Sequence, residues 1–210
     1  MSRLRLFDAY GVELEYMIVD AASLAARPLA DRLLVDDDGI VRPEVEHGPI
    51  SWSNELVSHV LELKTTTPAP SLDGLETGFA GSVREANARL APLGCVLLGT
   101  GAHPFFDPHA ETVIWPGEYT EVYRTYDRIF GVRGHGWSNL QSVHLNLPFG
   151  DDVEFGRLHA AIRLVLPIIP ALAASTPYLD GRRTDYLDSR LHVYRHNQDR
   201  VPELVGQVVP

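Results

Sequence analysis

The sequence contains a single cysteine and no long hydrophobic run, and both absences limit what the protein can be. Cys95 has no partner for an internal disulfide, so we expect a reducing, cytoplasmic setting in which Cys95 is an inert core residue. The longest nearly apolar run, residues 164–174, has eleven residues and two prolines, too few to cross a bilayer. The N-terminal stretch also lacks the apolar segment of a signal peptide. These absences predict a cytoplasmic protein without a membrane partner.

Basic residues are scarce relative to acidic ones. The chain has 18 lysines and arginines against 28 aspartates and glutamates, which gives a net charge of −10. A nucleic-acid partner is not expected, because binding one requires a basic stripe that engages phosphates. An acidic protein can still bind a nucleotide when divalent cations supply the local positive charge. At 210 residues, with 45% hydrophobic and 22% charged residues, the composition is typical of an ordinary globular protein.

The most informative stretch is GVELEYMIVD, residues 11–20. In a strand, Val12, Leu14 and Tyr16 point to one face, while Glu13 and Glu15 point to the other. Two carboxylates would then stand about 7 Å apart in an otherwise apolar strand. Their repulsion predicts that something positive lies between them.

The same alternation recurs in two later stretches. SVHLNL places His144 and Asn146 opposite its aliphatic residues, and VLELK does the same for Glu62 and Lys64. Each polar residue alone is typical of a half-exposed antiparallel sheet, but together they predict one polar surface. Oxygen ligands with one imidazole suit Mg²⁺ or Mn²⁺, and magnesium usually accompanies substrate phosphates. Glu55 lies seven residues before Glu62, an odd separation, so it joins this face only if a bend or loop intervenes.

The remaining pattern predicts how helices and turns surround the strands. We expect helices at residues 72–90, with Ser71 as N-cap and Gly94 as the stop, and at 118–130. A helix at 153–174 must be kinked or divided by its two prolines. Residues 36–39 form a hairpin turn, and VLLGT a further strand. Because the strands carry polar residues on one face, we expect an α+β fold: an antiparallel sheet with helices on one face and an open, polar, metal-binding face.

Several motifs, in order, resemble the glutamate–cysteine ligase and carboxylate–amine ligase families. The pattern G-x-E-x-E at Gly11, Glu13 and Glu15 resembles their first strand, and NELVSHVLELKTTTP their second acidic motif. GTGAHPFFDP is similar to their G-T-H-P-F loop, and SVHLN to the strand that supplies a metal-binding histidine. The segment ALAASTPYLDGRRTDYLDSR, which includes Arg190, is the strongest match.

This resemblance implies a glutamine-synthetase-like catalytic sheet and an ATP-dependent ligase, as in glutathione biosynthesis. The carboxylate of glutamate or a similar acid would attack ATP, and an amine, that of cysteine or a related compound, would capture the acyl phosphate. It also implies that Arg190 binds a substrate carboxylate or phosphoryl charge through its bidentate fork. Nucleotide contacts are implied for Glu13, Glu15 and Asn146. Two or three Mg²⁺ or Mn²⁺ ions would be held by Glu13, Glu15, Glu55, Glu62 and His144.

The sequence departs from the family pattern at two places. Ser142 stands where one branch has the first histidine of a His-x-His strand, so His144 is the only imidazole there. The chain stops at QVVP, where family members continue, so residues 1–210 resemble one catalytic-type domain truncated at its C-terminus. Two other functions stay open, a guanidino-kinase-like phosphotransferase and a non-catalytic domain that binds a nucleotide or an amino acid, and a homo-oligomer is not excluded. Weaker site candidates are Arg124, Arg128 and His135.

Overall fold

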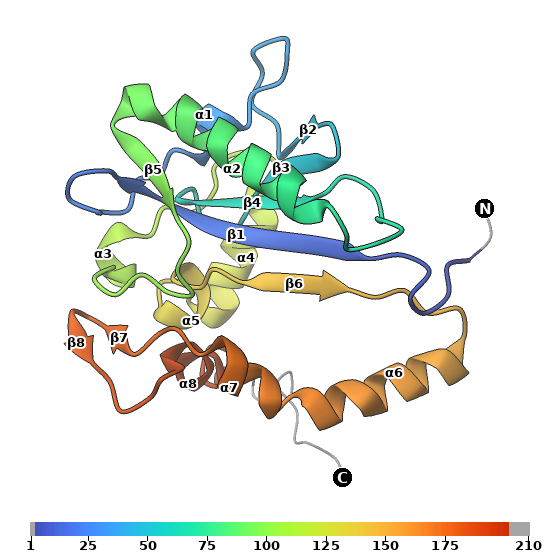
Figure 1. The fold of residues 1–210 in the computed structure, drawn as a ribbon. Helices are drawn as coiled ribbons and strands as arrows, with labels where there is room; N and C mark the ends of the chain where they lie inside the picture. The colour runs from blue at the N-terminus through green and yellow to red at the C-terminus, as the bar shows by residue number, and fades with distance from the viewer. Residues whose placement is uncertain (1–2, 202–210) are drawn as a thin grey trace.

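An antiparallel six-stranded sheet contains every stretch in which polar and apolar residues alternate (Figure 1). The computed structural model describes residues 3–201, so the QVVP ending lies outside the described residues. The strand order is β2-β3-β4-β1-β5, and β6 also pairs with β1. The strands are β1 (Gly11–Asp20), β2 (Glu44–His47), β3 (Ile50–Asn54), β4 (Val60–Thr65), β5 (Cys95–Leu98) and β6 (Val143–Asn146).

Strand β1 is the centre of the sheet because it pairs with three others. β4 follows one of its edges, whereas β5 and β6 share the other edge, with β6 beside the half that carries Glu13. In register, Glu15 stands opposite Glu62, and Glu13 stands between Lys64 and His144. Directly paired residues of antiparallel strands share a face. The prediction that these residues lie on one face of one sheet is therefore confirmed.

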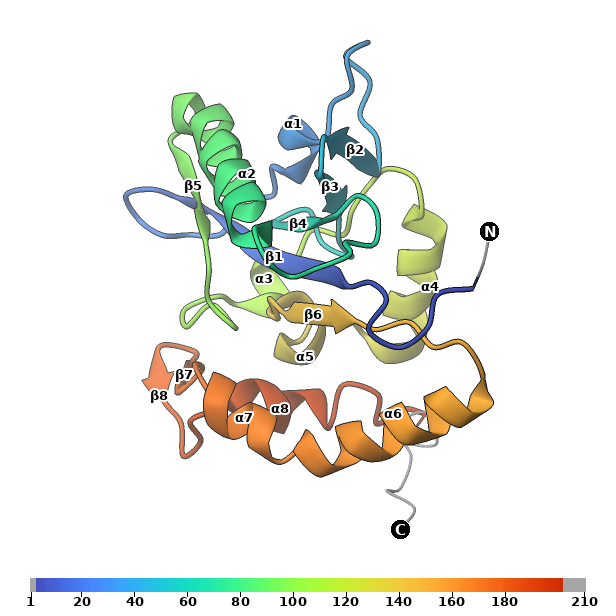
Figure 2. The ribbon, with the colours of Figure 1, turned by 45° about the vertical axis from the view of Figure 1, so that its right-hand side comes forward.

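The opposite face of the sheet is the hydrophobic core. Trp52, Leu61 and Leu63 are fully buried there, and helix α2 (Leu75–Leu90) covers them through Phe79 and Ala86. Figures 1 and 2 show α2 and the short α1 (Ala30–Leu33) on this side of the sheet. One face is thus sealed by aliphatic and aromatic contacts, which leaves the carboxylates on the other.

Helix α2 begins three residues later than predicted. Gly74 has a φ of 82°, a left-handed conformation that glycine adopts without strain, and the helix starts after it. Ser71 Oγ bonds to Asp73 instead of capping the helix, so the predicted N-cap is wrong. Gly94, with a φ of 67°, ends the 3-10 turn that follows α2, as predicted.

The C-terminal half supplies further helices. α4 (Thr120–Phe130) matches its prediction, and the predicted helix 153–174 divides into α6 (Asp152–Val165) and α7 (Ile168–Ala173) at Pro167. Figures 1 and 2 show α6, α7 and α8 (Ser189–Tyr194) beyond β6, away from α2. The remaining short elements are α3 (Pro108–Glu111), α5 (His135–Ser138), β7 (Tyr178–Leu179) and β8 (Arg182–Arg183).

Within residues 3–201, none of the helices combines the length and hydropathy that crossing a bilayer requires. The mixed helix and antiparallel-sheet architecture is as expected.

The position of the core predicts that substituting a buried leucine destabilises the protein far more than substituting an exposed one. Leu61 in β4 is 0% exposed and Leu164 in α6 is 78% exposed. Leu61→Ala should lower the free energy of unfolding by about 2–5 kcal/mol, because it leaves a cavity in the core. Leu164→Ala should change it by less than about 0.5 kcal/mol. Urea denaturation of both variants measures the difference, and equal effects would contradict this assignment of the core.

Candidate active site

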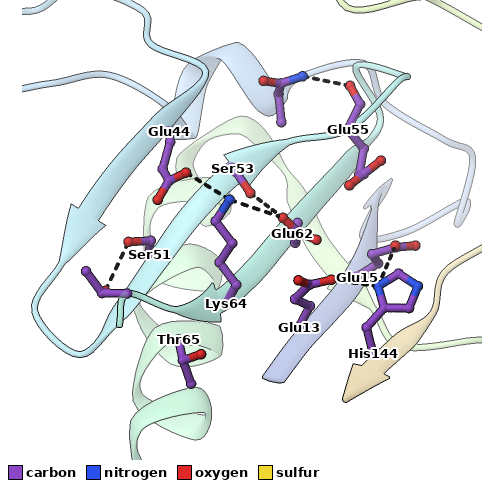
Figure 3. Close-up of polar contacts among 12 residues, drawn as sticks. Glu13, Glu15, Glu44, Ser51, Ser53, Glu55, Glu62, Lys64, Thr65 and His144 are labelled. Carbon is purple, nitrogen blue, oxygen red and sulfur yellow. Dashed lines mark hydrogen bonds and ion pairs between the residues drawn. The ribbon is translucent and has the colours of Figure 1, made fainter. Parts of the chain in front are cut away.

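Four carboxylates and one imidazole gather on the polar face (Figure 3). Glu13 and Glu15 come from β1, Glu62 from β4 and His144 from β6, while Glu55 follows directly after β3. Ligand atoms of Glu13, Glu62 and His144 lie within 4.8 Å of one another, and so do those of Glu15, Glu55 and Glu62. Because Glu62 belongs to both groups, the site is two adjoining triads that share one carboxylate.

Glu55 reaches this face because the chain bends between it and Glu62. β3 ends at Asn54 and β4 starts at Val60, so the two glutamates do not lie on one regular strand. Ser53 is paired with Glu62, and Glu55 is two residues further on, at the same parity as Ser53. The bend that the sequence required is present.

Burial favours the protonated, uncharged form of two carboxyl groups in the cluster. Burial, together with the charges of Glu15 and Glu62, raises the pKa of Glu55 to about 8. Burial also raises the pKa of Glu15, although the backbone N–H of Ser142 donates to this carboxylate at 2.9 Å and opposes the change. A bound divalent cation would replace the protons that such groups retain. The donor set, hard oxygens with one imidazole, fits Mg²⁺ or Mn²⁺.

Neighbouring polar groups compensate part of the charge. His144 Nδ1 lies 2.8 Å from Glu13 Oε2, and Asn146 Nδ2 donates to Glu13 Oε1 at 2.7 Å. Ser53 Oγ donates to Glu62 Oε2 at 2.5 Å. Asn146 thus contacts the cluster directly, which places it beside the predicted metal ligands.

Lys64 is a cation inside this acidic surface, and the sequence motifs did not single it out as a site residue. Its Nζ lies 2.8 Å from Glu44 and 3.6 Å from Glu62 (Figure 3). Burial lowers the pKa of Lys64, but the hydrogen bond to Glu44 and the charge of Glu62 outweigh burial and raise it. The ammonium therefore remains charged.

Sequence reasoning also missed strands β2 and β3, which carry Glu44 and Ser53. ISWSN alternates Ile50 and Trp52 with serines, and this alternation was the available signal.

Arg190 lies beside the other end of the cluster. Its Nη2 donates to Ser142 Oγ at 2.7 Å, and Ser142 in turn donates its backbone N–H to Glu15. A Cβ at Gly101 would stand 2.9 Å from Arg190 Cδ, so only glycine lets the loop after β5 approach this side chain. Arg190 Nε has no hydrogen-bond partner within residues 3–201. Ser142, the departure from the His-x-His strand, thus anchors the arginine.

Two cavities flank the acidic cluster. The larger, about 660 Å³, is lined by Glu15, His144 and Arg190 together with Leu166 and Ile169 of the C-terminal helical segment. The smaller, about 330 Å³, is lined by Glu13, Lys64 and Asn146 among other residues.

Gln141 also lines the larger cavity. Its amide oxygen and nitrogen are buried without a hydrogen-bond partner among the described residues.

The weaker candidates lie elsewhere. Arg124 forms a surface ion pair with Glu121 at 3.0 Å, and its side chain is 67% exposed. Arg128 accepts a bond from Arg200 through its backbone carbonyl. His135 Nε2 lies 3.0 Å from Asp180. None of the three candidates lines either cavity, so the structure does not bring them to the cluster.

His103 of the G-T-H-P-F-like loop is buried, and its Nε2 lies 2.8 Å from the carbonyl of Leu24. Its Nδ1 accepts the backbone N–H of Phe105. Its role in this chain is to hold the loop.

Comparison with known proteins identifies the family of the chain. Residues 9–208 match the model of glutamate–cysteine ligase family 2 (GCS2). An uncharacterized protein of Archaeoglobus fulgidus is 36% identical over 95% of this chain and 53% of its own length. A protein of Rubrobacter xylanophilus provisionally named glutamate–cysteine ligase 2-3 is 29% identical over 88% of this chain. One of Laribacter hongkongensis provisionally named glutamate–cysteine ligase 2 is 31% identical over 86% of it. The match covers 47% and 45% of their lengths, so the chain spans about half of these relatives.

The raised pKa of Glu55 predicts how stability depends on pH in metal-free, chelated buffer. The folded value, about 8, lies above the ordinary value of 4.5, so the stabilising effect of the bound proton is complete below pH 4.5 and disappears as pH rises through 8. Between these two values the free energy of unfolding should fall by up to about 1.4 kcal/mol for each pH unit. Denaturant midpoints at pH 6 and 8.5 measure this fall in the free energy of unfolding.

Two variants control this measurement. Glu55→Gln, which cannot ionise, should flatten the pH dependence, whereas Glu118→Gln, on the exposed surface, should leave it unchanged. A Glu55→Gln protein that keeps the wild-type slope would show that Glu55 does not hold the proton.

Proposed function

Because the chain belongs to glutamate–cysteine ligase family 2, we propose that it carries the catalytic sheet of an ATP-dependent carboxylate–amine ligase. The acid would be glutamate or a similar compound, and the amine that of cysteine or a related compound. One observation carries the proposal. Two triads of possible metal ligands share Glu62, and their members Glu13 and Glu15 line two different cavities. One of these cavities presents Arg190, whose Nε has no partner among the described residues.

The residues of the two triads are proposed to hold Mg²⁺ or Mn²⁺. These ions would supply positive charge to the phosphates of ATP, as in phosphoryl transfer generally. The protein's part is to fix the positions of the ligands. The hydrogen-bond register of β1, β4 and β6 sets where the ligand side chains lie. Ser53 orients Glu62, and Asn146 orients Glu13. Hydrogen-bond partners that orient the metal ligands in this way maintain the geometry of a metal site.

The acid substrate is proposed to bind in the larger cavity, with a carboxylate on Arg190. A guanidinium matches a carboxylate with two parallel hydrogen bonds, and Ser142 already fixes one end of this guanidinium. The cavity also reaches Glu15 and His144, so a bound acid extends toward the cluster. Its aliphatic wall excludes water from a reactive acyl group.

The proposed reaction has two steps. A carboxylate oxygen of the acid attacks the terminal phosphorus of ATP, the bond from that phosphorus to the bridging oxygen breaks, and ADP leaves. The nitrogen of the neutral amine then attacks the acyl carbon, phosphate leaves, and the nitrogen loses a proton to form the amide. Arg190 and the cluster position the reacting groups and neutralise charge, which accounts for most catalysis of this type.

Product analysis separates this function from its rivals. The ligase releases ADP, phosphate and an amide, whereas a guanidino-kinase-like enzyme releases ADP and a phosphorylated product. A binding domain takes up Mg²⁺–ATP without turnover.

The metal sites predict a thermal response. The melting temperature of the wild type should rise with millimolar Mg²⁺ or Mn²⁺ and rise further with ATP, since a ligand at a hundredfold excess over Kd contributes about 2.7 kcal/mol. Glu15→Gln should leave the metal-free protein equally stable or more stable, because a repulsive charge is gone, and should shrink the metal-dependent rise. A wild-type melt that ignores metal and nucleotide would contradict the proposed sites.

The proposed carboxylate site predicts a kinetic effect of Arg190→Lys. Lysine keeps the charge but loses the planar fork, so kcat/KM for the acid should fall at least tenfold, about 1.4 kcal/mol. Arg124→Lys, on the surface, is the matched control and should leave kcat/KM unchanged. Steady-state kinetics measure both. Unchanged kinetics in Arg190→Lys would mean that the arginine only supports Ser142.

A further inference from the structure

Lys64 is the single lysine of the chain, and the other 17 basic residues are arginines. It stands opposite Glu13 in the β1–β4 register and opposite Ser51 in the β3–β4 register, so its side chain belongs to the polar face. Lysine differs from arginine in carrying a compact charge with three donors on a flexible stem. The chain uses this residue once, beside the acidic cluster.

The surroundings of Lys64 tie it to both the cluster and a cavity. Glu44, outside both triads, holds the ammonium at 2.8 Å, and Glu62, the carboxylate that the triads share, lies at 3.6 Å. The side chain is 27% exposed, so it is accessible to a ligand. Of the described residues that line the 330 Å³ cavity, Lys64 is the only cation.

The ammonium and a divalent cation compete for Glu62. Two positive charges a few ångströms apart repel strongly in a partly buried site. A cation bound by the triads would take the charge of Glu62 and leave Lys64 attached to Glu44 alone. The remaining donors of the ammonium would then face the 330 Å³ cavity, where an anion can accept them.

We propose that Lys64 binds the terminal phosphates of a nucleoside triphosphate in the 330 Å³ cavity, after a divalent cation has displaced it from Glu62. This inference rests on the proposed function, since it names where that reaction's nucleotide lies. Lysine is a common phosphate ligand because it acts as a point charge. The Arg190 cavity, on the other side of the cluster, stays free for the acid.

Because Lys64 is the only lysine, selective labelling gives a direct signal. Protein made with ¹³C,¹⁵N-lysine and a lysine-free tag contains one labelled side chain. Mg²⁺ alone should shift its Cε and Nζ resonances as Glu62 is withdrawn. A non-hydrolysable ATP analogue with Mg²⁺ should shift them again, whereas adenosine with Mg²⁺ should not. Absence of the second shift while the analogue binds would overturn the proposal.

Calorimetry on variants supplies the second measurement. Lys64→Met should weaken binding of the Mg²⁺–ATP analogue at least tenfold, leave adenosine binding unchanged, and leave Mg²⁺ binding unchanged or tighter because a competing charge is gone. Lys64→Arg should recover part of the loss. Arg124→Met removes one positive charge from an exposed ion pair and should behave as wild type.

The outcomes separate this proposal from the proposed function. If the wild type does not bind the Mg²⁺–ATP analogue, both are overturned. If wild type and Lys64→Met bind it equally, Lys64 is only a counter-ion of Glu44 and Glu62, and the ligase proposal stands. Circular dichroism shows whether Lys64→Met folds. If it does not, the proposal is tested by the Lys64 resonances of the wild type and by the affinity of Lys64→Arg for the Mg²⁺–ATP analogue.

Discussion

Carboxylates that repel one another are kept together by the hydrogen-bond register of antiparallel strands. Glu13, Glu15 and Glu62 are not free to separate, because moving one of them by a residue would turn every side chain of its strand to the other face. The register is held in turn by the opposite face, where Trp52 and Leu63 are fully buried. The hydrophobic core therefore supplies the free energy that maintains an otherwise unfavourable concentration of negative charge.

One imidazole and two basic side chains lie around the edge of the cluster. His144 lies against Glu13 on one flank, Lys64 against Glu62 on another, and Arg190 is joined to Glu15 through Ser142. Glu55 has no such partner among the described residues, and its pKa is about 8 because burial and the neighbouring carboxylates both favour its protonated form. In the triad of Glu15, Glu55 and Glu62, the charge of Glu62 raises the pKa of both other carboxyl groups. Such an incompletely compensated centre is what a divalent cation would complete.

The sequence predicted the polar face more fully than the elements around it. Alternation in β1, β4 and β6 was sufficient, because a two-residue period assigns faces without knowledge of the partner strand. β2 and β3 were missed because both strands are short and Pro43 and Pro49 directly precede β2 and β3, which hid the alternation of ISWSN. The start of α2 was misplaced because the positive φ of Gly74 is a property of the folded backbone. The role of Lys64 depends on its partner Glu44, which only the register of β2 with β3 brings near.

The two cavities are formed by different parts of the fold, and under the proposed function this would separate metal binding from substrate choice. The 330 Å³ cavity is formed largely by β1, β4, β6 and the segments next to them, so its shape follows the sheet. The 660 Å³ cavity takes one wall from residues 166–173 and α8, where Leu172 is 84% exposed and little apolar packing fixes the helices. Segments with few buried contacts open and rearrange most easily. Under the proposed function, changes in that wall would alter which acid or amine fits without disturbing the carboxylates, because the strand register that holds the cluster does not pass through it.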